Sequence, residues 1–568
     1  MKLHSLGIKI SVSDQISLDD VAQLAVDGIE ILVCNRPDGE ADGQLPYVEI
    51  QGVAEVHAIQ VSHIPFSGGQ LSPNHVNEFK SLLSSGKRVH MYCRTGNRST
   101  QLWAAAHIQL GMDEQEVIAT AKNAGFEISD QVLAMSSTDK QKPKASPVVD
   151  SKSTAAPCYD VVIVGAGSGG IAAAASLLKR KSDLRIVLID PSEAHYYQPG
   201  WTMVGGGVFD SMSTYRQTKS LIPRGVSWIQ QAVASFSPAK DYIELSDGKL
   251  IYYRHLVVSP GLTLNWGGVE GLEETLGRNG VTSNYRFDLA PYTWKLVSEL
   301  KSGKAIFTQP PMPIKCAGAP QKALYLSADH WQKSGMSASV DIHFYNAGGV
   351  LFGVKDYVPA LQSYIDKYNA KVHYSHNLVK IDGDSKTAWF KNNNGDTSEE
   401  IVQTDFEMIH VCPPQIAPQF VRDSELSDGA GWLDVDKHTL RHTKFENVWG
   451  LGDVMNTPNA KTMAAVRKQV PVVATNIIAA LNKQEIRAAY DGYGSCPLTV
   501  ERGKIVLAEF GYGGKLLPSF PQWLIQGTKP TRLAWLLKSR VLPDIYWHAM
   551  LKGREWMAAP KDLHKMGD

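Results

Sequence analysis

Residues 159–190 read YDVVIVGAGSGGIAAAASLLKRKSDLRIVLID, and they decide the fold of the largest part of the chain. Tyr159 to Val164 predicts a buried parallel strand, and the glycine-rich turn after it leads into a helix of small residues. A second apolar strand, Arg185 to Ile189, ends in Asp190. This order of elements predicts the α/β class and a dinucleotide-binding βαβ unit.

The glycines of this turn have separate expected roles. Gly165 permits the tight turn, Gly167 lets a pyrophosphate approach the backbone, and Gly170 lets the helix pack on the strand. Asp190 follows at the distance at which a carboxylate binds ribose hydroxyls. A strand, a helix and an acidic residue in register make the glycine pattern far more specific than it is alone.

Two later segments favour FAD over NAD as the dinucleotide. HLVVSPG at 255–261 is a strand ending in a turn at Gly261, and NVWGLGD at 447–453 is a strand ending at Gly452 and Asp453, whose carboxylate can reach a ribityl chain. A nicotinamide site needs a second glycine fingerprint after the strand Val340 to Phe344, but YNAGGVLFG lacks its first glycine. The sequence therefore predicts FAD and two Rossmann-like domains, without a nicotinamide partner.

The whole chain has 568 residues, with 57 Lys+Arg against 57 Asp+Glu. This balance excludes the basic footprint of a nucleic-acid binder, and no His/Cys cluster predicts a metal site. No segment resembles a signal peptide or a membrane-spanning helix, so we expect an intracellular protein. The Ser-, Lys- and Pro-rich stretch 136–157 predicts a flexible linker. We therefore expect domains at 1–135, 158–500 and 501–568.

A cysteine loop marks the first of these domains. Val89 to Tyr92 predicts a strand, Thr100 to Leu110 predicts a helix, and CRTGNRS at 93–99 lies between them. A helix start behind a cysteine directs backbone N–H groups at the sulfur, which favours the thiolate and binds anions. Cys93 and Arg98 are therefore candidate catalytic residues.

This loop resembles that of the cysteine-phosphatase fold, in which five residues separate Cys from Arg, whereas four separate Cys93 from Arg98. A shorter loop suits a persulfide on Cys93 better than a phosphate, as in rhodanese-type sulfurtransferases. NRPDGE at 35–40 and HIP at 63–65 are similar to phosphatase-like sulfurtransferases fused to sulfur enzymes. A degenerate structural loop and an active phosphatase are the alternatives.

Two cysteines of the flavoprotein part follow predicted strands. Cys316 lies in PIKCAGAP after the strand Ala305 to Phe307, and Cys412 ends the strand in IHVCPP. Open α/β sheets bind ligands at the carboxyl ends of their strands, so both cysteines could meet at the flavin. Cys34, Cys158 and Cys496 are expected to be inert thiols.

At this point the sequence resembles the sulfide:quinone oxidoreductase family, of the type that includes the mitochondrial enzyme. HYYQPGWT at 195–202, KCAGAP at 315–320, VCPP at 411–414 and GD at 452–453 with KT at 461–462 carry this resemblance. It implies that Cys316 and Cys412 are the redox pair. The implied FAD contacts, together with the glycines above, are Ser168, Gly169, Asp190, Gln198, Val233, Gly261, Gly452, Asp453, Lys461 and Met463.

The implied function is oxidation of sulfide, with two electrons passed through FAD to a membrane quinone. A persulfide forms and its sulfur goes to a thiol such as glutathione, or to sulfite, through Cys93 of the fused domain. TRLAWLLKSR at 531–540 and IYWHAML at 545–551 predict a tail that lies on a membrane surface, at the cytoplasmic face. The sequence is compatible with a homo-oligomer. The alternatives are a type II NADH:quinone oxidoreductase and a non-catalytic, redox-sensing flavoprotein.

Overall fold

The computed structural model of the chain describes residues 1–133 and 158–566, apart from positions 2, 8, 42–43, 58, 84–86, 110–111, 113, 130–131 and 393–399. The predicted linker at 136–157 lies outside the described residues. The chain divides into two compact units, Met1–Lys152 and Ser153–Asp568. Each unit is described by itself.

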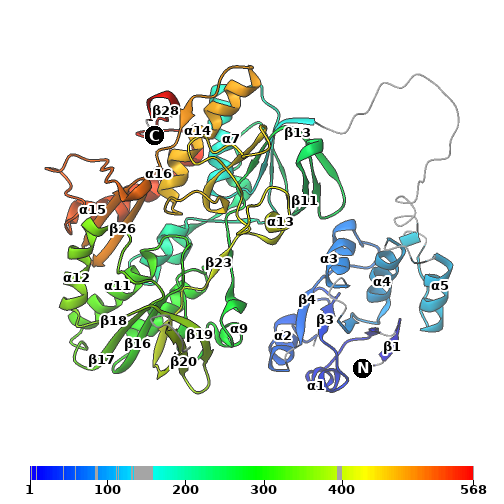
Figure 1. Ribbon diagram of the computed structural model, residues 1–568. Helices are drawn as coiled ribbons and strands as arrows, with labels where there is room; N and C mark the ends of the chain where they lie inside the picture. The colour runs from blue at the N-terminus through cyan, green and yellow to red at the C-terminus, as the bar shows by residue number, and fades with distance from the viewer. Residues whose placement is uncertain are drawn as a thin grey trace. The chain divides into compact units, whose positions relative to one another are not determined.

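The first unit is a sheet with helices on both faces (Figure 1). Its strand order is β1 (Leu3–Ser5), β2 (Ile10–Ser13), β5 (Val89–Tyr92), β3 (Ile31–Cys34) and β4 (Gln60–His63). The helices are α1 (Leu18–Val26), α2 (Tyr47–Val56), α3 (Pro73–Leu83), α4 (Asn97–Gln109) and α5 (Glu114–Asn123). Residues of α3, α4 and α5 fill one core and residues of α1 and α2 fill another, so the sheet is buried on both faces. The predicted strand at 89–92 is confirmed as the central strand.

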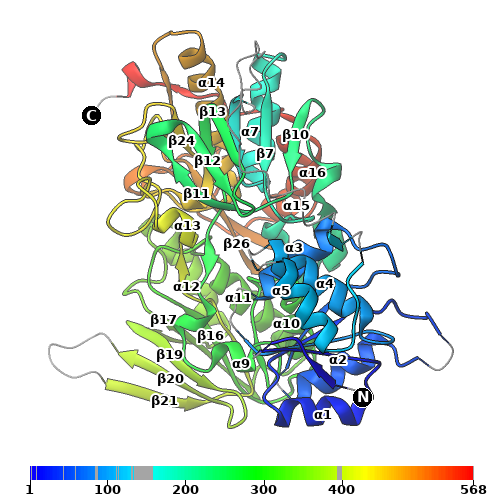
Figure 2. The same cartoon turned by 90° about the vertical axis from the view of Figure 1, so that its right-hand side faces the viewer.

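The second unit contains two α/β domains, as predicted, one with a mixed sheet and one with a parallel sheet (Figures 1 and 2). The first sheet has the order β10 (Val226–Ile229), β7 (Ile186–Ile189), β6 (Cys158–Val164), β13 (Leu250–Val258), β12 (Tyr242–Leu245) and β11 (Val233–Ser237), and β24 (Val448–Gly450) also pairs with β13. Helices α7 (Ser168–Arg180) and α14 (Met463–Leu481) belong to this domain and share its core with β6, β7 and β13. Chain segments almost two hundred residues apart thus complete one domain, because β24 pairs with β13 in parallel, with Val448 opposite Leu256.

The second sheet has the order β15 (Val281–Thr282), β22 (Met408–His410), β16 (Gly303–Gln309), β17 (Val340–Asn346) and β18 (Lys371–Tyr374). The larger helices of this domain are α10 (Leu289–Glu299), α11 (Ala319–Lys333) and α12 (Val358–Lys367). An antiparallel sheet of β19 (His376–Asp382), β20 (Thr387–Asn392) and β21 (Glu400–Asp405) lies beside it. The remaining short elements are β8 (Ala194–Tyr196), α8 (Trp201–Val204), β9 (Tyr215–Gln217), β14 (Thr263–Leu264), α9 (Leu272–Thr275), β23 (Gln415–Ile416) and α13 (Gln419–Arg422).

The C-terminal region begins with a hairpin of β26 (Gly494–Glu501) and β27 (Lys504–Phe510). The predicted domain boundary between residues 500 and 501 therefore falls inside this hairpin, which shares a core with α11. After it come α15 (Arg532–Leu536), a π-helical turn at Leu537–Val541 and α16 (Leu542–His548), and β28 (Lys561–Asp562) then pairs with β25 (Ala488–Ala489). Within the described part of the chain, no helix is both long and apolar enough to cross a bilayer.

Candidate active site

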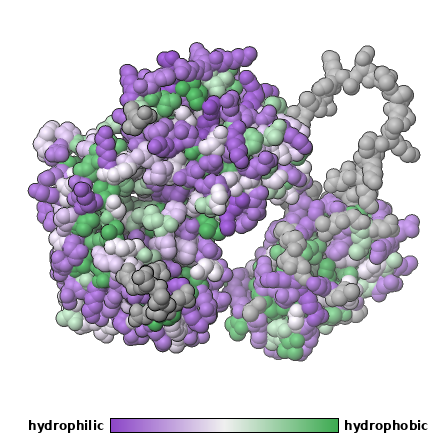
Figure 3. All heavy atoms as spheres, in the orientation of Figure 1, coloured by the Kyte–Doolittle hydropathy of each residue, from purple (hydrophilic) through white to green (hydrophobic). Residues whose placement is uncertain are grey.

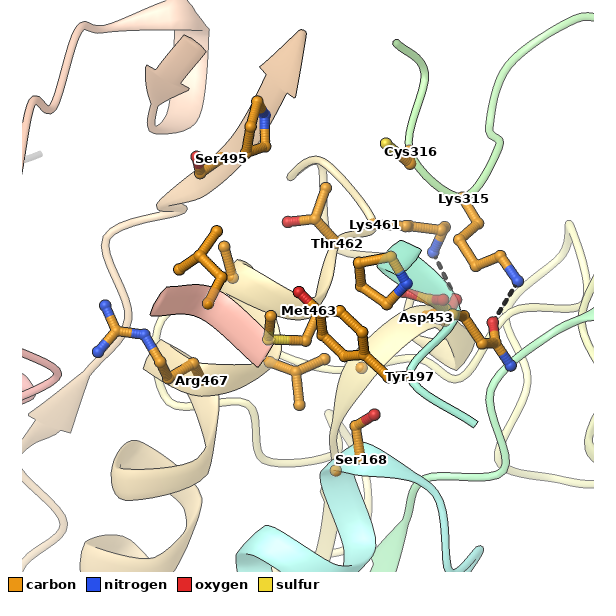
Figure 4. A pocket seen from close by; sticks show the side chains of 18 of the residues that line it. Ser168, Tyr197, Lys315, Cys316, Asp453, Lys461, Thr462, Met463, Arg467 and Ser495 are labelled. Carbon is orange, nitrogen blue, oxygen red and sulfur yellow. Dashed lines mark hydrogen bonds between the residues drawn. The ribbon is translucent and has the colours of Figure 1, made fainter. Parts of the chain in front are cut away.

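A cavity of about 440 Å³ lies in the second unit, within the size range of cofactor sites. Its wall includes the glycine turn before α7, the Cys316 loop, the start of α14, the β26–β27 hairpin and the C-terminal helices. Figure 4 shows this cavity, with Ser168 at one side and Cys316 and Lys315 at another. Segments that are distant in the sequence therefore meet at one site.

The glycine turn has the geometry that its spacing predicts. Gly165 has φ +102°, and a Cβ there would lie 2.3 Å from the Ser259 carbonyl oxygen. A Cβ on Gly170 would lie 1.9 Å from the Gly165 carbonyl oxygen, so this glycine allows the close packing of α7 on the turn. Asp190 accepts hydrogen bonds from the N–H groups of Ala166 and Ser192 at 2.7 and 2.8 Å, which anchors its carboxylate beside the turn.

The residues of the cavity fit FAD. The turn at Gly167 opens the positive N-terminal end of α7 to a pyrophosphate. Three side chains of the wall, Trp201, Thr202 and Asn284, have buried polar atoms without a hydrogen-bond partner among the described residues, so a polar ligand would satisfy them.

Charged residues surround the part of the cavity next to the cysteine loop (Figure 4). The Lys461 ammonium donates to the carbonyl oxygens of Asp453 and Met455 at 2.7 and 2.6 Å, and the Lys315 ammonium donates to Gln198 Oε1 at 2.5 Å. Burial lowers the pKa of Lys461 to about 8, although Asp453 opposes this shift. Burial raises the pKa of Asp453, against the pull of Lys315 and Lys461. A flavin ring at this place would meet cations that stabilise its reduced, anionic form.

The structure brings ten of the thirteen predicted cofactor residues to the cavity wall: Gly167, Ser168, Gly169, Asp190, Gln198, Gly261, Gly452, Asp453, Lys461 and Met463. Gly165 and Gly170 lie behind the wall and shape the turn. Val233 begins β11 and packs in the core of the first sheet, away from the wall. The FAD-binding roles of all thirteen residues thus remain predictions.

The partner of Cys316 differs from the one predicted. The Sγ atoms of Cys316 and Cys496 lie 3.5 Å apart, within hydrogen-bonding distance for two thiol groups. Cys496 lies on β26. This strand packs against α11, the helix that begins directly after the Cys316 loop. The Cys316 Sγ also accepts a hydrogen bond from the Lys322 ammonium at 3.0 Å. The hydrogen bond from Cys496 and the charge of Lys322 hold the pKa of Cys316 well below its ordinary value, while the same hydrogen bond and burial raise the pKa of Cys496.

No hydrogen bond joins Cys412 to Cys316 among the described residues, although Cys316 packs against the apolar cluster that contains Cys412. Its thiol is buried, donates to the Pro413 carbonyl oxygen at 3.9 Å and accepts from the Gln415 amide at 3.8 Å. Burial raises the pKa of Cys412 to about 12, so this thiol stays protonated. It does not line the cavity. Strand β22 ends two residues earlier, and the side chain turns into a small apolar cluster with Ile314.

Cys496 was missed because its signal is tertiary. It lies in a largely buried strand, where a cysteine looks like any core residue. The one local hint is Gly318, where a Cβ would lie 2.6 Å from the Cys496 Sγ and 2.3 Å from Leu498. Because Gly318 has no side chain, β26 can pack closely against the Cys316 loop.

A second missed residue, Lys538, comes from the π-helical turn of the C-terminal region. It is buried, lines the cavity, and has both Cys316 and Cys496 in its electrostatic environment. Burial and the charge of Lys322 lower its pKa to about 7, against the effect of the two thiols. Two lysines from different parts of the chain therefore surround the cysteine pair.

In the first unit, Cys93 is buried at the end of β5 and α4 begins four residues later. The Arg98 guanidinium donates to Glu40 Oε2 at 2.7 Å and to the Phe66 carbonyl oxygen at 2.9 Å. Arg36 donates to the same Glu40 oxygen at 2.8 Å. The NRPDGE stretch and the cysteine loop are therefore neighbours, joined by a carboxylate between two arginines.

Comparisons with known proteins agree with this division. Residues 2–109 match the family model "Beta-lactamase hydrolase-like protein, phosphatase-like domain", and residues 159–308 match "Pyridine nucleotide-disulphide oxidoreductase". The mitochondrial sulfide:quinone oxidoreductase of Dictyostelium discoideum is 42% identical over 399 residues, covering 69% of this chain and 86% of the relative. That of Mus musculus is 38% identical over 408 residues, covering 72% and 89%.

A solved structure gives the same fold. The sulfide:quinone oxidoreductase of Aquifex aeolicus superposes with a TM-score of 0.57 at 18% identity, covering 70% of this chain and 92% of the other. With two relatives above 30% identity that are matched over most of their length, the chain belongs to the sulfide:quinone oxidoreductase family, whose members are FAD-dependent, and it carries a phosphatase-like domain in addition.

Proposed function

We propose that this protein oxidises sulfide at Cys316 and Cys496 and passes two electrons to a quinone. The contact between these two thiols at the wall of the dinucleotide cavity carries the proposal. Cys316 faces the cavity with a lowered pKa, which suits a thiolate that gives up electrons, and Cys496 lies behind it. Cys412, the partner predicted from sequence, lacks these features.

The chemistry begins with the oxidised Cys316–Cys496 bridge. Hydrosulfide attacks the Cys496 sulfur, the S–S bond breaks, and Cys496 becomes a persulfide while Cys316 leaves as a thiolate. Lys322 and Lys538 stabilise this negative charge as it forms. FAD, when bound, takes up the electron pair and supplies it to the quinone. The outer sulfur moves to an acceptor, which leaves a thiolate on Cys496, and the bridge forms again as the two thiolates lose that electron pair.

An anaerobic titration tests this proposal. We expect sulfide to bleach the flavin absorbance of the purified protein and a short-chain quinone to restore it, with no bleaching by NADH. Bleaching by NADH alone would instead identify an NADH:quinone oxidoreductase. A flavin that responds to neither reductant would identify a sensor without turnover.

The first unit acts as a sulfurtransferase that takes the persulfide sulfur on Cys93 and gives it to a thiol or to sulfite. The match to a phosphatase-like domain and the four-residue spacing from Cys93 to Arg98 support this role. A tether to the flavoprotein would raise the local concentration of sulfur donor. Replacing Cys93 by Ser should change the yield and acceptor preference of the sulfane-sulfur product, whereas Cys158→Ser, which removes an exposed thiol, should change neither.

The C-terminal helices dock on the membrane that holds the quinone, at its cytoplasmic face. Leu533, Leu536 and Val541 are exposed on them, next to Arg532 and Arg540. Trp523 is 84% exposed in the preceding segment. Hydrophobic side chains gather on the left-hand side of this unit in Figure 3, where α15 lies in Figure 1. A Leu533→Glu, Leu536→Glu variant should lose binding to anionic vesicles and keep its flavin reduction by sulfide.

A further inference from the structure

Three carboxylates line the cavity: Asp190, Asp453 and Glu509. Asp190 lies beside the glycine turn, and Asp453 lies near Lys315 and Lys461, next to the cysteine loop. Glu509 lies on β27 in a different part of the wall, and because side chains alternate along a strand, it shares a face with Leu507. The apolar lining around this part is Leu507, Phe520, Leu537, Leu542, Ile545 and Ala549.

The Glu509 carboxylate is buried but well provided with donors. Its residue is 5% exposed. The Tyr493 hydroxyl donates to Oε1 at 2.5 Å, and the Ser519 N–H donates to Oε2 at 3.1 Å. Tyr357 holds the backbone, because its hydroxyl accepts from the Glu509 N–H and donates to the Glu509 carbonyl oxygen, both at 3.0 Å. The carboxyl group is therefore held in one position at the cavity wall.

The proposed reaction needs such a group. A quinone that gains two electrons must also gain two protons, and Glu509 is the only carboxyl group of the described residues that lines the cavity beside its apolar part. Tail residues Trp556 and Met557 line the cavity and are also largely exposed, so this part leads to the surface. Glu509 lines the same cavity as these two residues and as Cys316.

We propose that Glu509 delivers one proton to the quinone in the apolar part of the cavity. As one quinone oxygen gains negative charge, the Glu509 O–H bond breaks and the proton forms the new O–H bond of the quinol. The remaining carboxylate accepts from Tyr493 and Ser519 until water returns the proton, and water supplies the second proton of the quinol. This inference rests on the proposed function, because it assigns a residue to the quinone half of that reaction.

Stopped-flow measurements on the full-length protein with FAD bound separate the two halves. In the first, sulfide reduces the flavin; in the second, decylubiquinone reoxidises the sulfide-reduced protein. We expect Glu509→Gln to slow reoxidation by about 100-fold, the usual size of a lost proton-transfer catalyst, while reduction by sulfide stays within about 2-fold of the wild type. Quinone affinity, measured by quenching of tryptophan fluorescence in the oxidised protein, should also stay within about 2-fold.

Two further variants distinguish proton transfer from a structural role. Glu501→Gln changes a carboxyl group on β26 that does not line the cavity and should reoxidise at the wild-type rate, whereas Glu509→Asp should recover part of the lost rate. If Glu509→Gln binds too little FAD to be measured, Tyr493→Phe, which removes the donor to the carboxylate, should slow reoxidation alone.

The inference is overturned if Glu509→Gln reoxidises like the wild type, if flavin reduction or quinone affinity falls as much as reoxidation does, or if Glu501→Gln slows reoxidation as much as Glu509→Gln does. Failure of the proposed function looks different, since sulfide would then leave the wild-type flavin oxidised.

Discussion

Single residues fix the conformation of the cysteine loop. Cys316 itself has φ +54°, a left-handed conformation that non-glycine residues adopt at a cost of about 1–3 kcal/mol. Its N–H donates to the Lys461 carbonyl oxygen at 2.9 Å, and its carbonyl oxygen accepts from the Ala319 N–H at 2.7 Å. The surrounding hydrogen bonds thus hold the thiol at the cavity wall, close to the N-terminal end of α11.

The cysteine pair gives the first prediction. Cys316→Ser and Cys496→Ser should each lower sulfide-dependent flavin reduction by at least about 100-fold, because no S–S bond can then form for hydrosulfide to attack. Cys412→Ser should keep reduction within about 10-fold, because its thiol lies off the cavity. Rapid-mixing absorbance of the three variants decides between the partners. Equal loss in Cys412→Ser and none in Cys496→Ser would restore the pairing predicted from sequence.

Lys538 gives a prediction on stability. Its pKa falls from 10.5 to about 7 on folding, so below pH 7 the ammonium is charged in both states and its burial penalty is fully present. Between pH 7 and 10.5 the unfolded state binds a proton that the folded state lacks, so the free energy of unfolding contributed by this group rises with pH.

Lys538→Met should therefore stabilise the protein most at pH 6, by at most about 5 kcal/mol, and hardly at all near pH 10. Unfolding midpoints in guanidinium chloride at the two pH values measure the difference. Lys529→Met, at an exposed lysine before α15, is the control. A gain that is equal at both pH values would show that Lys538 is not buried as a charge.

At the scale of elements, helix α16 is joined to the dinucleotide turn by an oriented chain of hydrogen bonds. Burial lowers the pKa of His195 to about 4, so its ring is neutral. Its Nδ1 lies 3.2 Å from the Ala166 carbonyl oxygen and must carry the hydrogen, so Nε2 accepts from the Tyr546 hydroxyl at 2.5 Å. Tyr546 in turn accepts from the Ser168 hydroxyl at 2.8 Å.

Tyr546→Phe should weaken FAD binding by roughly 10-fold, because it leaves buried polar groups of the turn without a partner. Titration of the apoprotein with FAD, followed by flavin fluorescence, measures this effect. Tyr325→Phe removes a buried hydroxyl bonded to Leu361 in the second sheet domain and should leave the affinity unchanged. An unchanged affinity in Tyr546→Phe would mean that α16 only packs against the turn.

At the scale of the whole molecule, the two units have separate cores, each made of its own residues. We therefore expect residues 158–568 to fold alone and to reduce quinone with sulfide at a rate within about 2-fold of the full chain, since the cavity residues all lie after residue 158. The shortened protein should lose the Cys93-dependent change in sulfur products. A large drop in quinone reduction would show that the first unit contributes to the flavoprotein site.

The sequence by itself determined what depends on local spacing. The glycine turn from Gly165 to Gly170, Asp190 at the end of β7 and the central strand before Cys93 follow from periodicity and from the backbone freedom of glycine. The family resemblance also rests on such short, contiguous phrases. These features need no knowledge of which distant segments meet.

Only the tertiary structure decided which distant residues became neighbours. Cys496 and Cys316 are 180 residues apart, and Lys538 comes from a helical turn still further along the chain. Their meeting depends on the β26–β27 hairpin packing on α11, with Gly318 leaving room for it. Cys412 follows a strand as the sequence indicated, but the end of a strand does not fix where the next side chain points. Packing of distant segments, which local sequence patterns do not reveal, placed the thiol of Cys496 beside Cys316 instead.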